Sequence, residues 1–387
     1  MLSPGPPIWT RAAYAYRLYE RAICPLVKMR IPVAIVGATG IAGQQVLAAL
    51  DGHPDFEIAA LAASERSASK TFDEAITDME SGMRRWYVDG GEPPSAALKL
   101  EVQDARALRL DGIGVVFAAV ETDAARELEP IYAKYVPTVS TARPHRMEPD
   151  IPLVIPGVNL DHLKIVEEQR RRRGWKGYIA TLPNCTATGL AVTLKALDQR
   201  FGVESVIVTT MQGISGAGRD LPALDIVENI IPYIPREEER VTIETRKILG
   251  QYSANAIAEL PVRVSATCTR ASVLAGHTES VTVGLKRPAT TEDVIAAFED
   301  FGQDFTQLGL TNAPRRIITV HRNPMRPQPR LDRDSERGMT TSVGRIREDE
   351  VLPNGVKYLL VSHNAAMGAG RGAVLLAEYL KHAGYLG

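Results

Sequence analysis

The stretch IPVAIVGATGIAGQ, residues 31–44, decides the fold. Its first six residues are almost all apolar and mostly β-branched, which predicts a strand buried on both faces. The glycines Gly37, Gly40 and Gly43 follow at GxxGxxG spacing, and QQVLAALDGHP then reads as a helix ended by glycine and proline. A strand, a glycine-rich turn and a helix in this order predict the dinucleotide-binding turn of a Rossmann-like sheet.

Beyond this turn, strands and helices continue to alternate. EIAALAAS (57–64), GIGVVFAAV (112–120) and PTVSTA (137–142) read as further apolar strands with helical stretches between them. Such alternation predicts an α/β fold with a doubly wound parallel sheet. After about residue 150 the strands carry polar interruptions and the helices between them lengthen, which predicts a second, α+β domain.

The bulk composition excludes several classes of protein. With 45 basic and 46 acidic residues, the formal net charge of -1 argues against a nucleic-acid partner. No apolar run approaches the ~18 residues that a membrane span needs. The three cysteines, Cys24, Cys185 and Cys268, have no CxxC spacing, so we expect no disulfide framework and no metal site, but a reducing cytoplasm. Residues 1–28 are an appended helix, an overlong start or an arginine-rich targeting segment.

Two stretches predict how a nucleotide is bound. The three glycines let the backbone approach a pyrophosphate at the helix N-terminus, where free N–H groups point at it. The second strand ends Ser-Glu-Arg-Ser at 64–67, and its hydroxyls and guanidinium suit the 2′-phosphate of NADP better than a carboxylate would. The adjoining Glu65 leaves NAD open. The predicted cofactor-binding residues are Gly37, Thr39, Gly40, Ile41, Gly43, Ser64, Arg66 and Ser67.

Cys185 is the candidate nucleophile. It stands in PNCTATG between the strand-like YIATL and the helical LAVTLKAL, so we expect it at a helix N-terminus, where the pKa of a thiol is lowered. The alternative, a small buried thiol, fits Cys268 in VSATCT better. A thiolate that attacks an aldehyde gives a thiohemiacetal, whose hydride can pass to a nicotinamide to leave a thioester.

A proton-transfer group and a substrate clamp follow further along the chain. Arg270 and His277 lie seven residues apart with Gly276 between them, so both can reach the ends of neighbouring strands. His277 has the unperturbed pKa that proton transfer near neutral pH requires, and Arg270 offers the planar fork that grips a carboxylate. Together with Cys185 and a nucleotide fold, they predict an active site.

From about Arg30 to the C-terminus the chain resembles the aspartate-β-semialdehyde dehydrogenases, in particular their archaeal and fungal branch. So many ordered matches are far more specific than any one motif. The matching stretches are GATGIAGQ (37–44), LAASERSA (61–68), PLVIPGVNLDHL (152–163), PNCT (183–186), TMQGISGAG (210–218), ETRKILG (244–250), GHTES (276–280) and RPQPRLDR (326–333).

The resemblance implies roles for individual residues. It implies Cys185 as the nucleophile, His277 as the acid/base, and Gln212 as the glutamine that orients the reacting carbonyl or a water. It also implies that Arg270 binds the α-carboxylate of the substrate and that Glu244 receives its amino group. The expected reaction is NADPH-dependent reduction of 4-aspartyl phosphate to L-aspartate 4-semialdehyde and phosphate, a step that serves lysine, threonine and methionine synthesis.

The resemblance further implies Lys247 near the phosphate, Asn364 beside the nicotinamide, and a homodimer or homotetramer formed through the second domain. The tail helix is expected to fold back onto the nucleotide domain. The predicted divisions are an N-terminal extension at 1–29, an NADP-binding domain at 30–160, a catalytic and dimerisation domain at 161–345, and a returning C-terminal segment at 346–387.

Three positions depart from the family pattern and keep alternatives open. Arg143, Arg219 and Met367 stand where the family usually has other residues, and the first and third are expected near the cofactor or the phosphate. One alternative is an acyl reductase similar to malonyl-CoA reductase on the same scaffold, although Glu244 favours a substrate with an amino group. Another is a non-catalytic NADP-binding relative.

Overall fold

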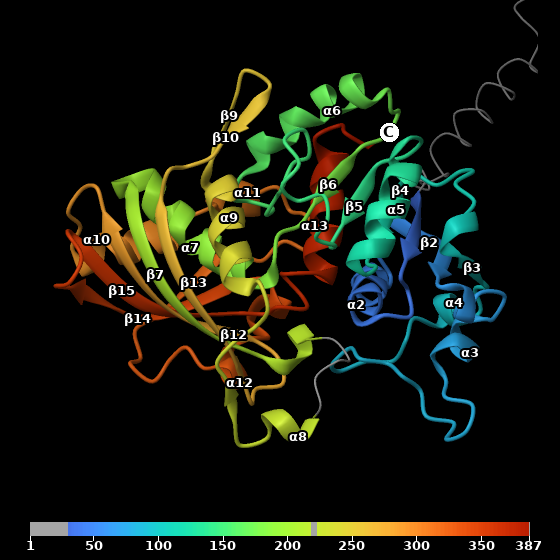
Figure 1. Cartoon of the computed structure of the whole chain (residues 1–387), viewed down its shortest axis with the longest axis horizontal. Helices are drawn as coiled ribbons and strands as arrows, with labels where there is room; N and C mark the ends of the chain where they lie inside the picture. The colour runs from blue at the N-terminus through green and yellow to red at the C-terminus, as the bar shows by residue number, and fades with distance from the viewer. Residues whose placement is uncertain (1–29, 218–222, 387) are drawn as a thin grey trace, which may run out of the picture.

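The computed structural model of the chain describes residues 30–217 and 223–386 (Figure 1). The extension predicted at 1–29, Arg219 and Gly387 lie outside the described residues. Two sheets organise the rest, one parallel and one mixed, and Figure 1 shows them on opposite sides of the molecule.

The first sheet is wholly parallel and has the strand order β3-β2-β1-β4-β5-β6. This is the doubly wound order of dinucleotide-binding folds, and it confirms the predicted Rossmann-like sheet. Its strands are β1 (Ile31–Val36), β2 (Phe56–Ala63), β3 (Val102–Asp104), β4 (Val115–Ala118), β5 (Thr138–Ser140) and β6 (Ile179–Thr181).

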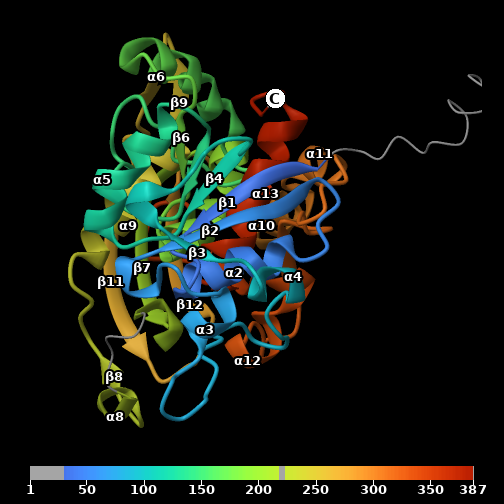
Figure 2. The ribbon, with the colours of Figure 1, turned by 90° about the vertical axis from the view of Figure 1, so that its right-hand side faces the viewer.

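Helices cover both faces of this sheet because alternate strand residues point to opposite sides. On one face Val33 and Ile35 of β1 pack with α2 (Ile41–Leu50) and α13 (Gly370–His382); on the other, Ala34 and Val36 pack with α5 (Thr122–Ala133). Figure 2 shows the sheet between these layers. The tail helix α13 therefore belongs to the core of the parallel sheet. The shorter helices on this side of the molecule are α3 (Phe72–Ile76), α4 (Ser95–Leu98) and α6 (Ile165–Arg173).

The strand β6 differs from the sequence expectation. YIATL was assigned to the catalytic domain that begins at residue 161, but the structure pairs Ile179 with Thr138 and Thr181 with Ser140, which makes β6 an edge strand of the parallel sheet. A short apolar strand looks the same in either sheet, so its sequence could not decide between them.

The second sheet has seven strands in the order β13-β14-β15-β12-β7-β11-β8 and mixes parallel and antiparallel pairs. It confirms the predicted α+β domain. Its strands are β7 (Val203–Gln212), β8 (Ile230–Ile231), β11 (Arg263–Ala271), β12 (His277–Leu285), β13 (Ile318–His321), β14 (Thr341–Asp349) and β15 (Gly355–Ser362). A separate hairpin joins β9 (Gln251–Ser253) and β10 (Ala256–Ala258).

One face of the second sheet is covered by helices and the other is open. Buried and exposed residues alternate along β7, with Val206 and Val208 buried and Ile207 45% exposed between them. The covering helices are α7 (Cys185–Phe201), α9 (Glu237–Leu249) and α10 (Thr291–Asp300). The remaining short helices are α8 (Ala223–Ile226), α11 (Gln303–Thr306) and α12 (Pro329–Asp332). Within the described ranges, no helix has the length and apolar character that a bilayer crossing requires.

Candidate active site

The candidate nucleophile stands where the chain passes from the first sheet to the second. The turn after β6 leads into α7, whose first residue is Cys185, as the sequence predicted. The Sγ atom of Cys185 lies 3.2 Å from Nε2 of His277, the first residue of β12. Two groups that are 92 residues apart in the chain are thus brought into hydrogen-bond contact.

The thiol of Cys185 does not have the lowered pKa that its place at a helix N-terminus suggested. Burial, followed by the charge of Glu237, raises its pKa to about 12, and Arg146 and Arg270 oppose this rise. At the cap of α7 the side-chain oxygen of Asn184 accepts the N–H groups of the two residues that follow Cys185. The backbone N–H of Thr186 also lowers the pKa of the thiol, but burial outweighs this effect.

The ring of His277 presents a proton to the sulfur. The backbone N–H of Gly213 donates to its Nδ1 at 3.1 Å, so in the neutral ring the proton resides on Nε2, which faces Cys185. Burial, with the nearby Arg270, lowers the pKa of His277 to about 3. In this closed site the imidazole is therefore a neutral ring whose Nε2–H donates a hydrogen bond to the sulfur.

Gln212 ends β7, Arg270 is the last residue but one of the adjacent strand β11, and the two are register partners. Arg270 is 6% exposed, and its NH1 donates to the carbonyl of Gly213 at 2.9 Å. A Cβ on Gly216 would stand 3.1 Å from that guanidinium and 3.2 Å from the ring of His277. The predicted quartet of Cys185, His277, Gln212 and Arg270 thus meets in one place.

Glu244 of α9 also reaches this place, through contacts that the sequence analysis missed. Its Oε1 accepts from NH1 of Arg146 at 3.0 Å, and its Oε2 accepts from the backbone N–H of Asn184 at 2.6 Å. Arg146 is 7% exposed and also donates to the carbonyl of Thr141. Arg146 lies three residues after Arg143, which departs from the family pattern. That proximity was the only sequence feature that pointed to Arg146.

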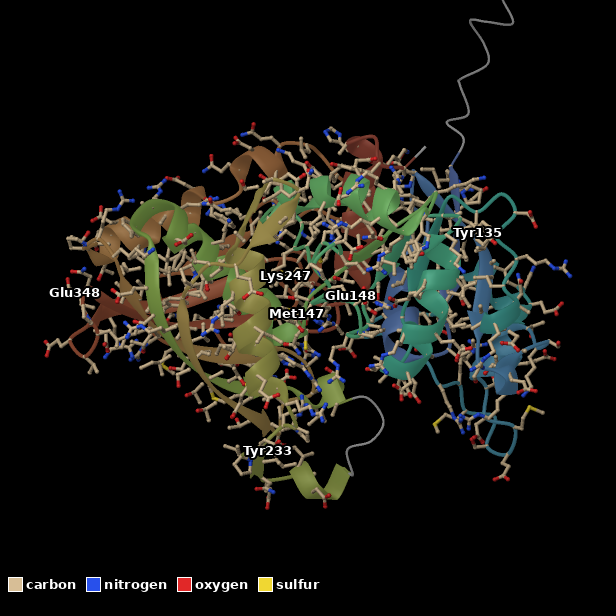
Figure 3. The ribbon with its side chains drawn as sticks, turned by 45° about the horizontal axis from the view of Figure 1, so that its top comes forward. Tyr135, Met147, Glu148, Tyr233, Lys247 and Glu348 are labelled. Atoms are coloured by element: carbon tan, nitrogen blue, oxygen red, sulfur yellow. The ribbon has the colours of Figure 1, made fainter. Side chains whose placement is uncertain are left out.

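Lys247 differs from its expected role at the phosphate. Its ammonium donates three hydrogen bonds of 2.7 to 2.8 Å, to the carbonyls of Arg146, Glu148 and Ile151. An ammonium has three protons, so no donor remains for a substrate. The side chain is 4% exposed, and burial lowers its pKa to about 8. Figure 3 shows Lys247 against Met147 and Glu148, in the loop that it holds.

The tail loop between β15 and α13 closes over the site. Asn364 accepts from the N–H of Gly276 through Oδ1 and donates to the hydroxyl of Ser215 through Nδ2, both at 2.9 Å. Gly368 packs on the nucleophile so closely that a Cβ there would lie 2.7 Å from that of Cys185. Met367, one of the departures, points into the hydrophobic core of the second sheet.

The glycine-rich turn has the geometry of a phosphate cradle. Gly37 has a φ of 84°, and a Cβ there would lie 2.3 Å from the carbonyl oxygen of Ala119. A Cβ on Gly43 would meet the carbonyl oxygen of Gly37 at 2.2 Å. The N-cap of α2 is Gly40, which has no side chain to accept hydrogen bonds from the first N–H groups of the helix. These N–H groups can therefore point at a phosphate. The turn fits a dinucleotide pyrophosphate.

The other predicted cofactor residues lie at the same edge of the parallel sheet. Thr39 and Ile41 belong to the turn and the first position of α2. A single turn of helix follows β2 and carries Ser64, Arg66 and Ser67. Because β1 and β2 are parallel, the carboxyl ends of the two strands lie at the same edge of the sheet. This is where the adenosine ribose of a dinucleotide lies in such sheets.

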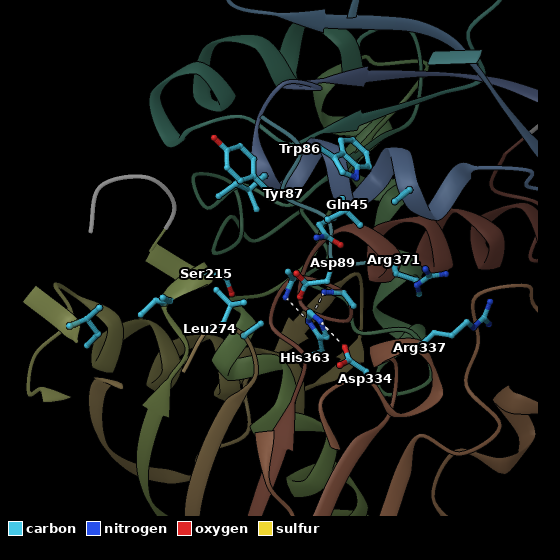
Figure 4. A pocket seen from close by; sticks show the side chains of 18 residues that line it. Gln45, Trp86, Tyr87, Asp89, Ser215, Leu274, Asp334, Arg337, His363 and Arg371 are labelled. Carbon is cyan, nitrogen blue, oxygen red and sulfur yellow. Dashed lines mark hydrogen bonds and ion pairs between the residues drawn. The ribbon is translucent and has the colours of Figure 1, made fainter. Parts of the chain in front are cut away.

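A cavity of about 600 Å³ opens between α2 and the second sheet, and Ile41 at the start of α2 is part of its lining (Figure 4). Ser215 and Leu274 line it from the catalytic side, and His363 and Arg371 line it from the tail. The loop of residues 86–89 forms another wall, held there because the side chain of Gln44 accepts from the N–H of Tyr87 at 2.7 Å. Nothing in the sequence of that loop marked it as part of the site.

Comparisons with known proteins agree with this geometry. Residues 32–166 match the model of the semialdehyde dehydrogenase NAD binding domain, and residues 194–367 match that of the semialdehyde dehydrogenase dimerisation domain. The aspartate-semialdehyde dehydrogenase of Methanothermobacter thermautotrophicus is 40% identical over 90% of this chain and 99% of its own. That of Candida albicans is 38% identical over 90% of this chain and 97% of its own. The chain belongs to the aspartate-semialdehyde dehydrogenase family.

Solved aspartate-semialdehyde dehydrogenases share the whole architecture. The crystal structure of the Candida albicans enzyme with NADP has a TM-score of 0.83 at 36% identity and covers 92% of this chain and all of its own. The second enzyme of Vibrio cholerae, complexed with ASA, has a TM-score of 0.71 at 26% identity over 92% of this chain and 99% of its own. The resemblance to the archaeal and fungal branch is thereby confirmed.

Proposed function

We propose that this chain is an NADPH-dependent aspartate-semialdehyde dehydrogenase that reduces 4-aspartyl phosphate to L-aspartate 4-semialdehyde and phosphate. The observation that carries the proposal is the 3.2 Å contact between Cys185 Sγ and His277 Nε2 within the fold of that family. The reported relatives bear the same name, so neither malonyl-CoA reduction nor a non-catalytic role gains support.

The chemistry runs through Cys185. Its sulfur attacks the acyl carbon of aspartyl phosphate, the S–C bond forms, the C–O bond to the phosphate breaks, and the thiol proton leaves with the phosphate to give an aspartyl thioester. The hydride that reduces this thioester comes from the nicotinamide of bound NADPH. When the C–S bond then breaks to release the aldehyde, the Nε2–H of His277 donates a hydrogen bond to the departing thiolate, which takes up its proton from solvent.

The substrate is oriented by charges around the sulfur. Among the described residues, Arg270 donates from NH1 to the Gly213 carbonyl and makes no other hydrogen bond, so the rest of its fork can grip the α-carboxylate. Glu244 supplies a buried carboxylate for the amino group. Lys247 acts as a positioning residue, because it holds the loop that carries Arg146, whose cation faces the site.

The assignment of NADP as the cofactor follows from the nucleotide turn and the end of β2. The turn around Gly37 and Gly43 admits a pyrophosphate, and Ser64, Arg66 and Ser67 can bind a 2′-phosphate. Asn364 lies between His363 and Ala365, which line the cavity, and it orients the tail loop, so it is our candidate for the nicotinamide end. The NADP complex of the Candida albicans relative supports this assignment.

Assembly and location complete the proposal. We propose at least a homodimer, supported by the match of residues 194–367 to a dimerisation domain. A reducing cytoplasm would keep Cys185 as the free thiol that the mechanism needs.

Replacing the nucleophile tests the mechanism. Cys185→Ala removes the sulfur that carries the acyl group, so turnover should fall by about a thousandfold or more while NADPH binding stays near that of the native chain. Phosphate-dependent NADP reduction with aspartate semialdehyde measures turnover, and fluorescence titration measures NADPH binding. Cys268→Ala is the matched control, because that thiol lies in the interior of β11. Residual activity of the Cys185 variant near the native level would contradict the mechanism.

The acyl acceptor is tested on the unmodified chain. Phosphate-dependent oxidation of aspartate semialdehyde is compared with CoA-dependent oxidation of malonate semialdehyde. The proposal expects the first activity to exceed the second by a large factor, and the reverse order would overturn the substrate assignment.

A further inference from the structure

Glu237, in the first turn of α9, is a buried carboxylate that the mechanism above does not use. It is 4% exposed, and its Oε1 accepts from three side chains: Asn184 at 2.9 Å, Thr186 at 3.2 Å and Gln212 at 3.3 Å. Its Oε2 accepts from Arg240 at 3.3 Å. Two of these four contacts go to the chain neighbours of the nucleophile and a third goes to Gln212, so Glu237 joins α9 to the catalytic end of α7 and to the end of β7.

The contact with Gln212 fixes which end of that amide faces the substrate. An ionised carboxylate accepts hydrogen bonds and donates none, so the amide nitrogen of Gln212 has to face Glu237. The same nitrogen donates to the hydroxyl of Thr210 at 3.3 Å. The carbonyl oxygen is left as the polar end directed away from Glu237, and among the described residues it accepts no hydrogen bond.

This orientation decides between two roles for Gln212. With its nitrogen occupied, it cannot donate to the oxygen of a reacting carbonyl. It can only accept from a hydroxyl or a water. An oxyanion on the reacting carbon has to be met by other donors, and the Nε2–H of His277 is one that lies at the sulfur.

The charge of Glu237 acts against the nucleophile and therefore does not serve to activate it. After burial, Glu237 is the main cause that raises the pKa of Cys185, against the cations of Arg146 and Arg270. Glu237 itself faces Arg240 on its own helix, Arg270 and Cys268 on β11, and Glu279 on β12. A carboxylate in this place makes the thiol harder to ionise, so its contribution has to lie in the side chains that it orients.

We propose that Glu237 is a positioning residue that locks the Gln212 amide with its carbonyl oxygen toward the reacting carbon, so that Gln212 serves as a hydrogen-bond acceptor during turnover. The inference rests on the proposed function and adds a residue to it. The same oxygen of Glu237 orients the Asn184 amide, whose carbonyl end caps the helix of the nucleophile.

The test separates thiol reactivity from turnover. Glu237→Gln keeps the shape but removes the charge and can donate to Gln212, so the amide can flip. We expect alkylation of Cys185 by iodoacetamide at neutral pH to become several-fold faster, while kcat falls roughly tenfold, the value of one lost hydrogen bond. Glu239→Gln, an exposed change on the same helix, should leave both rates within about twofold of native.

A second pair of variants asks whether Glu237 acts through Gln212. Gln212→Met removes the acceptor, and the proposal expects most of the Glu237→Gln effect on kcat to vanish in that background. Effects that multiply fully would overturn it. An unchanged kcat of the Glu237→Gln variant would also overturn the proposal. The same holds if its alkylation rate and its kcat both fall and its unfolding temperature drops, since a general loosening of the fold predicts that pattern. Alkylation needs no substrate, so a wrong substrate assignment would appear instead as an inactive native chain.

Discussion

Glu279, two residues after His277 on β12, illustrates how far burial can change a single side chain. Both of its carboxyl oxygens are buried, and neither has a hydrogen-bond partner among the described residues. Burial, followed by the charge of Glu237, raises its pKa well above 4.5. A carboxyl with a raised pKa in the folded state adds stability below its unfolded pKa and loses it as the pH rises through the folded pKa.

The pH dependence of stability tests this reading of Glu279. Glu279→Gln keeps the shape and cannot ionise, so its free energy of unfolding, relative to the native chain, should increase between about pH 5 and about pH 8. Urea unfolding at both pH values measures the difference. The matched change Glu348→Gln, on the exposed part of β14, should give the same difference at both. If the Glu279→Gln variant instead lost stability relative to the native chain as the pH rises, the charged form of Glu279 would be the one that stabilises the fold.

Single residues also mark the limits of what the sequence could predict. Cys185, His277 and Arg270 were found from the chemistry of their motifs, and Gln212 was found from the family resemblance alone. The structure brings all four together. Lys247 was assigned a place near the phosphate because the family resemblance implies a lysine there. Its three carbonyl partners lie 96 to 101 residues away, and no local pattern shows that a donor is already saturated.

At the scale of elements, the contact between α2 and α13 joins the nucleotide turn to the end of the chain. A Cβ on Gly370, the first residue of α13, would lie 2.3 to 2.4 Å from Gln45 of α2. Glu378, also on α13, accepts from His53 just after α2 and from Asn312. The helix that carries the phosphate cradle is therefore fixed by a segment more than 300 residues later.

Widening this contact should disturb the cradle. Gly370→Ala places a methyl group against backbone atoms of α2, so we expect a loss of about 1–3 kcal/mol in stability and a several-fold weaker NADPH affinity. Thermal unfolding and fluorescence titration measure the two effects. Gly91→Ala, where a Cβ would meet nothing within 4 Å, should change neither. Native affinity in the Gly370 variant would mean that α2 can move without harm to the cradle.

Elements differ in how well the sequence predicted them. The strand–turn–helix unit at β1 and α2 was clear because its apolar run, glycine spacing and helix all gave the same answer. The strand β6 was placed in the wrong sheet, because only its pairing with β5 defines where it belongs. That pairing joins Ile179 to Thr138, 41 residues earlier in the chain. Pairing over such distances leaves no trace in local composition.

At the scale of the whole molecule, we expect the open face of the second sheet, within the residues that match a dimerisation domain, to contact a second copy. Ile207 is 45% exposed in the centre of β7, between strands β11 and β12. We expect Ile207→Glu to shift the chain toward monomer, because burying an unpaired carboxylate in such an interface is strongly unfavourable. Sedimentation velocity measures the mass. Val351→Glu, at a site 82% exposed between β14 and β15, is the control that should keep the native mass. An unchanged mass for the Ile207 variant would place the interface elsewhere.

The saturated ammonium of Lys247 also constrains how the molecule can move. It joins α9, which covers the second sheet, to the loop of residues 146–151 that follows β5 of the first. A single cation with three carbonyl partners behaves as a pivot, because the bonds tolerate small rotations but not separation. Moving the loop of residues 146–151 away from α9 would therefore have to break these three bonds as well as the Arg146–Glu244 ion pair.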